Sequence, residues 1–207
     1  MLPGVFIQPK KSLRIIYPKA IWDLEDSGKK VFLTFDDGPV TGITEWVLDE
    51  LKKYQIKASF FCVGENILKY PEVFSRILQE EHTVGNHSFN HVKGFKTKAA
   101  DYLKNIDECE KLTRSKLFRP PYGQLKPGQY KKLLVSGYKI VMWDVISYDY
   151  AKITPKVCLK KVTDNVKNGS IVLFHDNPKA EKNLKYALPK TIEHFLKLDY
   201  SFLPLPH

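Results

Sequence analysis

The 207-residue sequence lacks several features that would mark a specialised class of protein. It has only three cysteines, Cys62, Cys109 and Cys158, which are too few and too scattered for a disulfide framework. Their odd number favours a reducing compartment. No apolar run is long enough to cross a bilayer, and the chain has no internal repeat, low-complexity tract or long linker. These absences favour one folded unit.

The N-terminus also lacks the long apolar centre of a signal peptide. Its apolar stretch, residues 2–7, is short, is interrupted by Pro3 and Gly4, and is followed by Lys10 and Lys11. The sequence as given therefore predicts a cytoplasmic protein. Export by another route, removal of a leader, and a place at the cell envelope stay open as alternatives.

The positive charge is not concentrated in one run. The net charge is +10, and it is distributed over separate lysine pairs, which usually mark solvated faces. A basic surface could favour an anionic cell-wall polymer or a membrane face that carries lipid-linked sugars. Because no nucleic-acid-binding module is recognisable, we expect no nucleic-acid partner. The sequence implies neither a membrane nor an obligate protein partner.

Apolar patterning predicts alternating strands and helices, which is typical of a parallel sheet covered on both faces. The expected strands span residues 31–35, 58–63, 117–119, 139–143 and 170–174. The expected helices span residues 44–54, 71–81, 97–115, 128–136, 155–167 and 183–198. The length suits one α/β barrel better than two domains. The segment 89–96 is expected to be a loop over the site.

Two short segments contain residues that can bind a metal ion. Residues 34–39 read Thr-Phe-Asp-Asp-Gly-Pro, so Asp36 and Asp37 lie where a predicted strand ends in a turn. Residues 87–91 read His-Ser-Phe-Asn-His, and His87 and His91 can face one centre if this stretch forms a helical turn. Two histidines and a carboxylate form the ligand set of a hydrolytic zinc centre. Alone, each segment is also common as a polar turn or a solvated helix face.

Three further segments place a polar residue at the end of an apolar strand. Residues 118–123 join Arg119 to a proline turn, residues 141–150 lead to Asp149, and residues 171–176 lead to His175. In α/β proteins, catalytic groups gather at the carboxyl edge of the sheet. Five such strand ends therefore indicate one site.

In this order, the motifs resemble those of a known family. The segments TFDDGP, HSFNH, RPPYG, a strand ending in Asp149, and LFH are similar to those of the polysaccharide deacetylases. These are metal-dependent carbohydrate esterases of family 4 with a NodB homology domain. The resemblance implies a single distorted (β/α) barrel of the NodB type over residues 1–207, with residues 1–30 as an extension that packs on the barrel.

The resemblance also implies roles for the residues of the first motifs. Asp37, His87 and His91 would bind a divalent metal, most readily Zn²⁺, with Co²⁺ or another ion as an alternative. Asp36 would be the general base that takes a proton from the attacking water. Arg119 would pair with this base and hold its side chain, because a guanidinium stays charged and offers a planar fork.

Roles for the later motifs follow from the same resemblance. The backbone N–H of Tyr122 would stabilise the negative oxygen of the tetrahedral intermediate. His175 would be the general acid, and Asp149 would keep it protonated near neutral pH by raising its pKa. Leu173 would line the pocket for the acetyl methyl group.

The chain departs from the family pattern in its fourth motif. Tyr150 stands where most members have a tryptophan that walls the acetyl pocket, and Ile146 stands where many have an acidic residue. We therefore expect Tyr122, Leu173, Tyr150 and Trp143 to contact the substrate, although Trp143 could instead belong to the core.

The predicted function is metal-dependent removal of acetyl groups from N-acetylglucosamine units of a glycan or glycan precursor, such as peptidoglycan or chitooligosaccharide. The expected partner is this acetylated saccharide. Two alternatives remain at this point: an amide hydrolase acting on a small non-sugar substrate, and a non-catalytic glycan-binding protein with the same fold.

Overall fold

The computed structural model describes residues 11–24 and 28–206, and its centre is a sheet of parallel strands. The strands are β1 Lys30–Asp36, β2 Ser59–Cys62, β3 Thr83–Asn86, β4 Leu117–Phe118, β5 Lys139–Ile140, β6 Val145–Ile146, β7 Ser170–His175 and β8 Ser201–Phe202. Their order is β5-β4-β3-β2-β1-β7-β6, and β8 pairs with β1 beside this path. Each paired neighbour is parallel.

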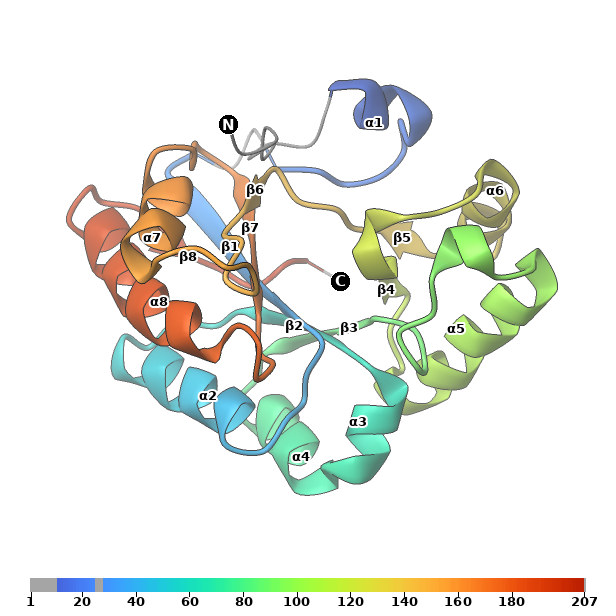
Figure 1. Cartoon of the computed structure of the whole chain (residues 1–207), viewed down its shortest axis with the longest axis horizontal. Helices are drawn as coiled ribbons and strands as arrows, with labels where there is room; N and C mark the ends of the chain where they lie inside the picture. The colour runs from blue at the N-terminus through green and yellow to red at the C-terminus, as the bar shows by residue number, and fades with distance from the viewer. Residues whose placement is uncertain (1–10, 25–27, 207) are drawn as a thin grey trace.

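Helices surround the curled sheet (Figure 1). They are α1 Lys11–Ile16, α2 Ile43–Lys53, α3 Gly64–Lys69, α4 Pro71–Gln79, α5 Ala99–Thr113, α6 Pro127–Val135, α7 Pro155–Thr163 and α8 Glu181–Leu196, with 3-10 turns η2 Gly94–Lys96 and η3 Pro121–Gly123. Proline begins α4, α6 and α7, where its missing N–H costs no helical hydrogen bond. The expected distorted (β/α) barrel is confirmed, and the strands curl into a half-barrel.

Strand β1 carries apolar side chains on both of its faces. Leu33 and Phe35 pack with the helices, whereas Phe32 packs with Phe61 and Ile171 in a second cluster. This alternation follows from the two-residue period of a strand. A strand that is buried on both faces is fixed in register, so the polar residues at its carboxyl end are held in place.

The segment after α1 connects two strands that do not pair with each other. Ile21 forms a parallel bridge with Val141, just beyond β5, and Asp23 forms an antiparallel bridge with Ser170 at the start of β7. Among the described residues, β5 and β6 are the unpaired ends of the strand order. Residues 21–23 therefore lie across the open side of the sheet.

Several elements were not expected from the sequence. Helices α1 and α3 and strands β3 and β8 are short, between two and six residues, and their apolar periodicity is correspondingly weak. The strand expected to end in Asp149 instead ends at Ile146, as β6. None of the helices within residues 11–24 and 28–206 has the length and apolar character needed to cross a bilayer.

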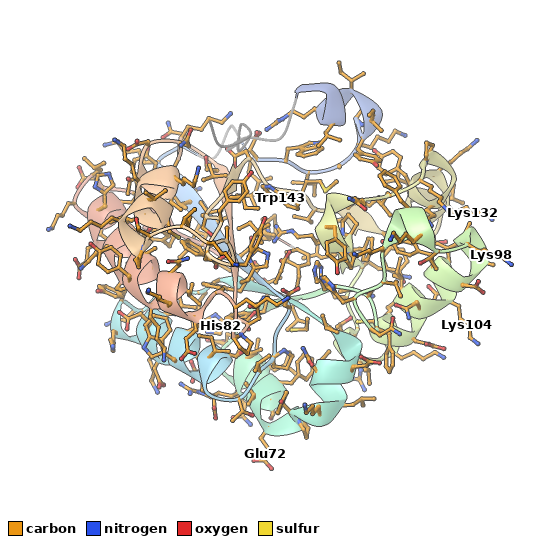
Figure 2. The ribbon with its side chains drawn as sticks, in the orientation of Figure 1. Glu72, His82, Lys98, Lys104, Lys132 and Trp143 are labelled. Carbon is orange, nitrogen blue, oxygen red and sulfur yellow. The ribbon has the colours of Figure 1, made fainter. Side chains whose placement is uncertain are left out.

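The lysines of the α5 and α6 region contribute to a basic outer surface. Figure 2 shows Lys98, Lys104 and Lys132 at the edge of the molecule, pointing away from the sheet. Lys98 precedes α5, Lys104 lies within it, and Lys132 lies in the last turn of α6. This arrangement matches the solvated charge that the separate lysine pairs predict.

Candidate metal and catalytic site

The polar strand ends meet around one cavity of about 540 Å³. Asp36 ends β1, His87 follows β3, Arg119 follows β4, and His175 ends β7. Every candidate residue from the sequence lines this cavity except Arg119 and Asp149, which lie directly behind Asp36 and His175. The structure thus brings the candidates together at the carboxyl edge of the sheet.

Asp37, His87 and His91 form a cluster with the size and chemistry of a metal site. Asp37 Oδ1 lies 3.1 Å from His91 Nε2 and 3.5 Å from His87 Nε2. One ligand atom from each residue lies within 4.8 Å of the other two. One carboxylate oxygen and two imidazole nitrogens suit Zn²⁺ and related divalent ions.

The helical turn considered for residues 87–91 does not form, and the loop expected over residues 89–96 begins within this stretch. This stretch is a loop in which Ser88 and His91 have positive φ values of 65° and 56°. The loop still brings the rings of His87 and His91 together, with centroids 5.1 Å apart. The two histidines, four residues apart, are therefore brought together by a reversal of the backbone. The pattern of apolar residues in the sequence does not reveal such a reversal.

Asp37 Oδ1 supports the fit of this cluster to a cation. It is buried and, within the described part of the chain, accepts no hydrogen bond, although it faces two imidazoles. A buried carboxylate oxygen without a partner is costly unless a cation satisfies it. Burial alone would raise the pKa of the Asp37 carboxyl, but His87 and His91, when protonated, outweigh it and hold the pKa well below its ordinary value.

The tautomer of His87 follows from its second nitrogen. His87 Nδ1 lies 2.8 Å from the carbonyl oxygen of Arg119, which can only accept. Nδ1 therefore carries the proton in the neutral ring, and the lone pair of Nε2 points toward Asp37. This is the arrangement in which a histidine binds a metal.

Asp36 is fixed by a fully buried arginine. Arg119 Nη1 donates to Asp36 Oδ1 and to Thr34 Oγ1, each at 2.8 Å, and Nη2 donates to the Met142 carbonyl at 2.8 Å. Burial lowers the pKa of the Arg119 guanidinium, and the ion pair with Asp36 opposes this shift. Arg119 binds Oδ1 of Asp36, so the other oxygen, Oδ2, is the one that can accept a proton. Asp36 Oδ2 lies 3.7 Å from His87 Nε2.

His175 is paired with the buried carboxylate of Asp149. Its Nδ1 lies 2.8 Å from Asp149 Oδ1, and its backbone N–H donates to Asp149 Oδ2 at 2.7 Å. Burial would lower the pKa of His175, but Asp149 in particular raises it, to about 9. The imidazole is thus held as a proton donor at neutral pH, and its side chain remains 13% exposed to the cavity.

Apolar and aromatic side chains form the remaining cavity wall. Leu173 is almost fully buried, and Tyr150 is 42% exposed with its ring against His175, at a centroid distance of 4.8 Å. Trp143 also lines the cavity and packs against Gly123. Tyr122 contacts the ring of His91 at 4.7 Å. Trp143 therefore contributes to the site as well as to the core.

Comparison with known proteins agrees with this arrangement. A family model described as polysaccharide deacetylase matches residues 23–141, more than half of the chain. The chain belongs to the polysaccharide deacetylase family. The membership confirms the family and the enzyme class that the motifs predict, a carbohydrate deacetylase.

Several polysaccharide deacetylases resemble the chain over most of its length. A peptidoglycan-N-acetylglucosamine deacetylase of Bacillus cereus is 33% identical over 184 residues, which cover 86% of this chain and 67% of that protein. The peptidoglycan-N-acetylmuramic acid deacetylase PdaC of Bacillus subtilis is 33% identical over 159 residues, covering 74% of this chain and 33% of PdaC. The crystal structure of the Bc1960 peptidoglycan N-acetylglucosamine deacetylase, in complex with 4-naphthalen-1-yl-N-oxidanyl-benzamide, superposes with a TM-score of 0.87 at 30% identity. The superposition covers 96% of this chain and 95% of the Bc1960 chain.

Two supporting residues of this polysaccharide deacetylase were missed in the sequence. Asp176 is fully buried and accepts hydrogen bonds from the backbone N–H of Gly38 at 3.0 Å and the hydroxyl of Thr44 at 2.6 Å. Asn177 Nδ2 donates to Asp37 Oδ2 at 2.6 Å. Asp176 and Asn177 are the first two residues after His175, and that position at a strand end was the available signal.

Proposed function

We propose that this chain is a metal-dependent deacetylase that hydrolyses N-acetyl groups on N-acetylglucosamine units of peptidoglycan or a related glycan. The observation that carries the proposal is the convergence of the Asp37, His87 and His91 cluster, the Asp36 and Arg119 pair, and the His175 and Asp149 pair on one cavity. The relatives supply the substrate class, because one is a deacetylase of N-acetylglucosamine and another a deacetylase of N-acetylmuramic acid in peptidoglycan.

Asp37, His87 and His91 would hold the divalent ion, with zinc as the first candidate. When bound, the ion would supply Lewis acidity, which lowers the pKa of water and polarises the acetamide carbonyl. Asp36 takes the proton from the attacking water, because its Oδ2 is not engaged by Arg119. Arg119 prevents this carboxylate from rotating away, so the base stays aimed at the cavity.

His175 donates a proton to the leaving amine, since an amide nitrogen is a poor leaving group until it is protonated. Asp149 orients the imidazole through Nδ1, which leaves Nε2 as the donor. The backbone N–H of Tyr122, held by Pro120 and Pro121, is our candidate donor to the oxygen that becomes negative during the attack.

Leu173, Tyr150 and Trp143 are proposed to contact the sugar and its acetyl group. Leu173 provides an apolar surface for the methyl group, and the two aromatic rings provide faces and edges against which a sugar ring can pack. Because Tyr150 is smaller than tryptophan and carries a hydroxyl, we expect the acetyl pocket to be wider and more polar than with a tryptophan.

A peptidoglycan substrate favours a place at the cell envelope over the cytoplasm that the sequence alone predicts. Both the Bacillus cereus and the Bacillus subtilis relatives are peptidoglycan deacetylases. Fractionation of cells that express the full-length protein, with detection of the chain in the wall and cytoplasmic fractions, would decide between the two.

Acetate release tests the function directly. Purified protein is incubated with chitooligosaccharides, peptidoglycan and acetylxylan, with and without chelator, and with Zn²⁺ or Co²⁺ added back. We expect chelator-sensitive release from the N-acetylated glycans. The sugar that loses acetyl, identified by mass spectrometry of the digested peptidoglycan, separates N-acetylglucosamine from N-acetylmuramic acid.

Simple amides as further substrates, and a saccharide-binding measurement beside the assay, discriminate the alternatives. Turnover of simple amides without release from any glycan would support a small-molecule amide hydrolase. Saccharide binding without turnover, in protein with a full complement of metal, would support the non-catalytic glycan-binding protein and contradict the proposal.

A further inference from the structure

We propose that Asn177 is a positioning residue that selects which oxygen of Asp37 faces the metal. The inference rests on the metal site proposed above and concerns a residue outside the ligand set. Asn177 lies in the loop between β7 and α8, two residues after His175.

The orientation of the Asn177 amide is determined by its hydrogen bonds. Its Oδ1 accepts from the backbone N–H of Lys179 at 2.9 Å and of Ala180 at 3.1 Å. Backbone N–H groups can only donate, so this side of the amide must be the oxygen. The amino group therefore faces Asp37, and Nδ2 lies 2.6 Å from Asp37 Oδ2.

This hydrogen bond divides the two oxygens of Asp37 between two roles. Oδ2 is occupied by Asn177, whereas Oδ1 is buried, accepts no hydrogen bond from the described residues, and faces His87 and His91. The carboxylate thus presents one oxygen to the site and uses the other as an anchor. A ligand that is held in this way loses little freedom when an ion binds.

The backbone of Asp37 needs such an anchor. Asp37 has a φ of 83°, a conformation that side chains other than glycine rarely adopt and that surrounding contacts must enforce. Asn66 in α3 donates to the Asp37 carbonyl at 2.7 Å, and Asn177 secures the side chain. Two neutral amides from different elements therefore hold the residue without adding charge beside the ion.

The test separates the donor of Asn177 from its acceptor. Asn177→Ser retains an oxygen for the N–H groups of Lys179 and Ala180 but is too short to reach Asp37, while Asn177→Ala removes both functions. Asn165→Ser is the matched control, because its amide donates to Lys161 at the end of α7, away from the cavity. Co²⁺ affinity is measured by competition with a chromophoric chelator, and melting is measured on the metal-free proteins.

We expect both Asn177 variants to bind Co²⁺ about 10- to 100-fold more weakly than the wild type. The metal-free Asn177→Ser protein should melt close to the wild type, and the Asn165→Ser protein should bind Co²⁺ normally. Wild-type affinity in Asn177→Ser would overturn the inference while leaving the metal site intact. A wild-type protein that binds no Co²⁺ would instead overturn the metal site itself, and this inference with it.

Discussion

The floor and the rim of the cavity are built on different principles. We define the floor as Asp36 with Arg119 and Thr34 behind it, and the rim as Asp37, His91 and Tyr122. The floor residues lie in or beside strands and are at most 3% exposed. All three rim residues have positive φ values, of 83°, 56° and 61°; Asp37 and His91 lie in loops, and Tyr122 lies in the 3-10 turn η3. The floor is fixed by the sheet, whereas the rim depends on individual side-chain contacts.

Two neighbouring residues make this difference concrete. Asp36 and Asp37 are adjacent in sequence, yet Asp36 is paired with a buried guanidinium and Asp37 faces two imidazoles. A change of backbone conformation between them, from strand to left-handed, sends the two carboxylates to different partners. The proposed separation of base from ligand thus originates in the end of β1.

The largest expected effect is a loss of acetate release, and metal content distinguishes a variant of the proposed base from a variant of a proposed ligand. Asp36→Asn on the floor should retain bound Co²⁺ and lower acetate release about 10²- to 10⁴-fold, because it removes a general base. His91→Ala on the rim should lose both metal and activity. Metal content by elemental analysis, together with acetate release, gives both readouts. Full activity in Asp36→Asn would refute the assigned mechanism.

Breaking the floor should also cost stability. Arg119→Met leaves Asp36 buried without its counter-charge, so the free energy of unfolding should fall by about 3–5 kcal/mol. Arg114→Met, at the exposed end of α5, is the control and should change it by less than about 0.5 kcal/mol. Urea unfolding followed by circular dichroism measures both. An equal loss of unfolding free energy in Arg119→Met and Arg114→Met would show that the ion pair between Arg119 and Asp36 does not stabilise the floor.

The pair on the opposite wall predicts a pH dependence. The pKa of His175 is about 9 in the folded protein, against an ordinary value of 6.5. The protonated ring therefore stabilises the folded state. This contribution is complete below pH 6.5 and is lost as the pH rises through about 9. Activity that needs the protonated ring should decline over the same alkaline range. Asp149→Asn should move this decline toward about pH 6.5, which a pH–rate profile would reveal. An unchanged profile would argue against His175 as the acid.

The smallest expected effect concerns the turn that joins floor to rim. A Cβ at Gly38 would overlap the carboxylate of Asp176, which is itself buried and held by Thr44. Gly38→Ala should therefore lower the free energy of unfolding by about 1–3 kcal/mol. Gly128→Ala, where a Cβ meets nothing within 4 Å, should be neutral or slightly stabilising. Thermal melts of the two variants would be compared, and similar melting temperatures would contradict the tight fit at Gly38.

The floor was easier to predict from sequence than the rim. The apolar run before Asp36 identifies β1, and the expected strand 31–35 matches Lys30–Asp36 to within one residue at each end. The longer helices were also predicted, but with less exact ends. The expected helix 44–54 corresponds to Ile43–Lys53, whereas the expected helix 155–167 ends four residues earlier, at Thr163. In these elements the apolar residues that give the sequence its periodicity are the ones buried in the fold, so the sequence pattern predicts the element.

The rim could not be predicted in the same way. The histidine spacing at residues 87–91 would also fit a helical turn, whereas the structure has a loop there. Its left-handed residues, Ser88 and His91, are not glycines, so no local signal marks the reversal. The contact of Asn177 with Asp37 joins residues far apart in the chain, and only the fold makes it visible.

The bridges of residues 21–23 constrain the order in which the chain can be assembled during synthesis. Ile21 pairs beside Val141, and Asp23 pairs with Ser170, so the segment leaves the ribosome long before either partner exists. Contacts of such large sequence separation slow folding, because a long loop must close before they form. The part of the barrel that is made early is therefore among the last to find its place.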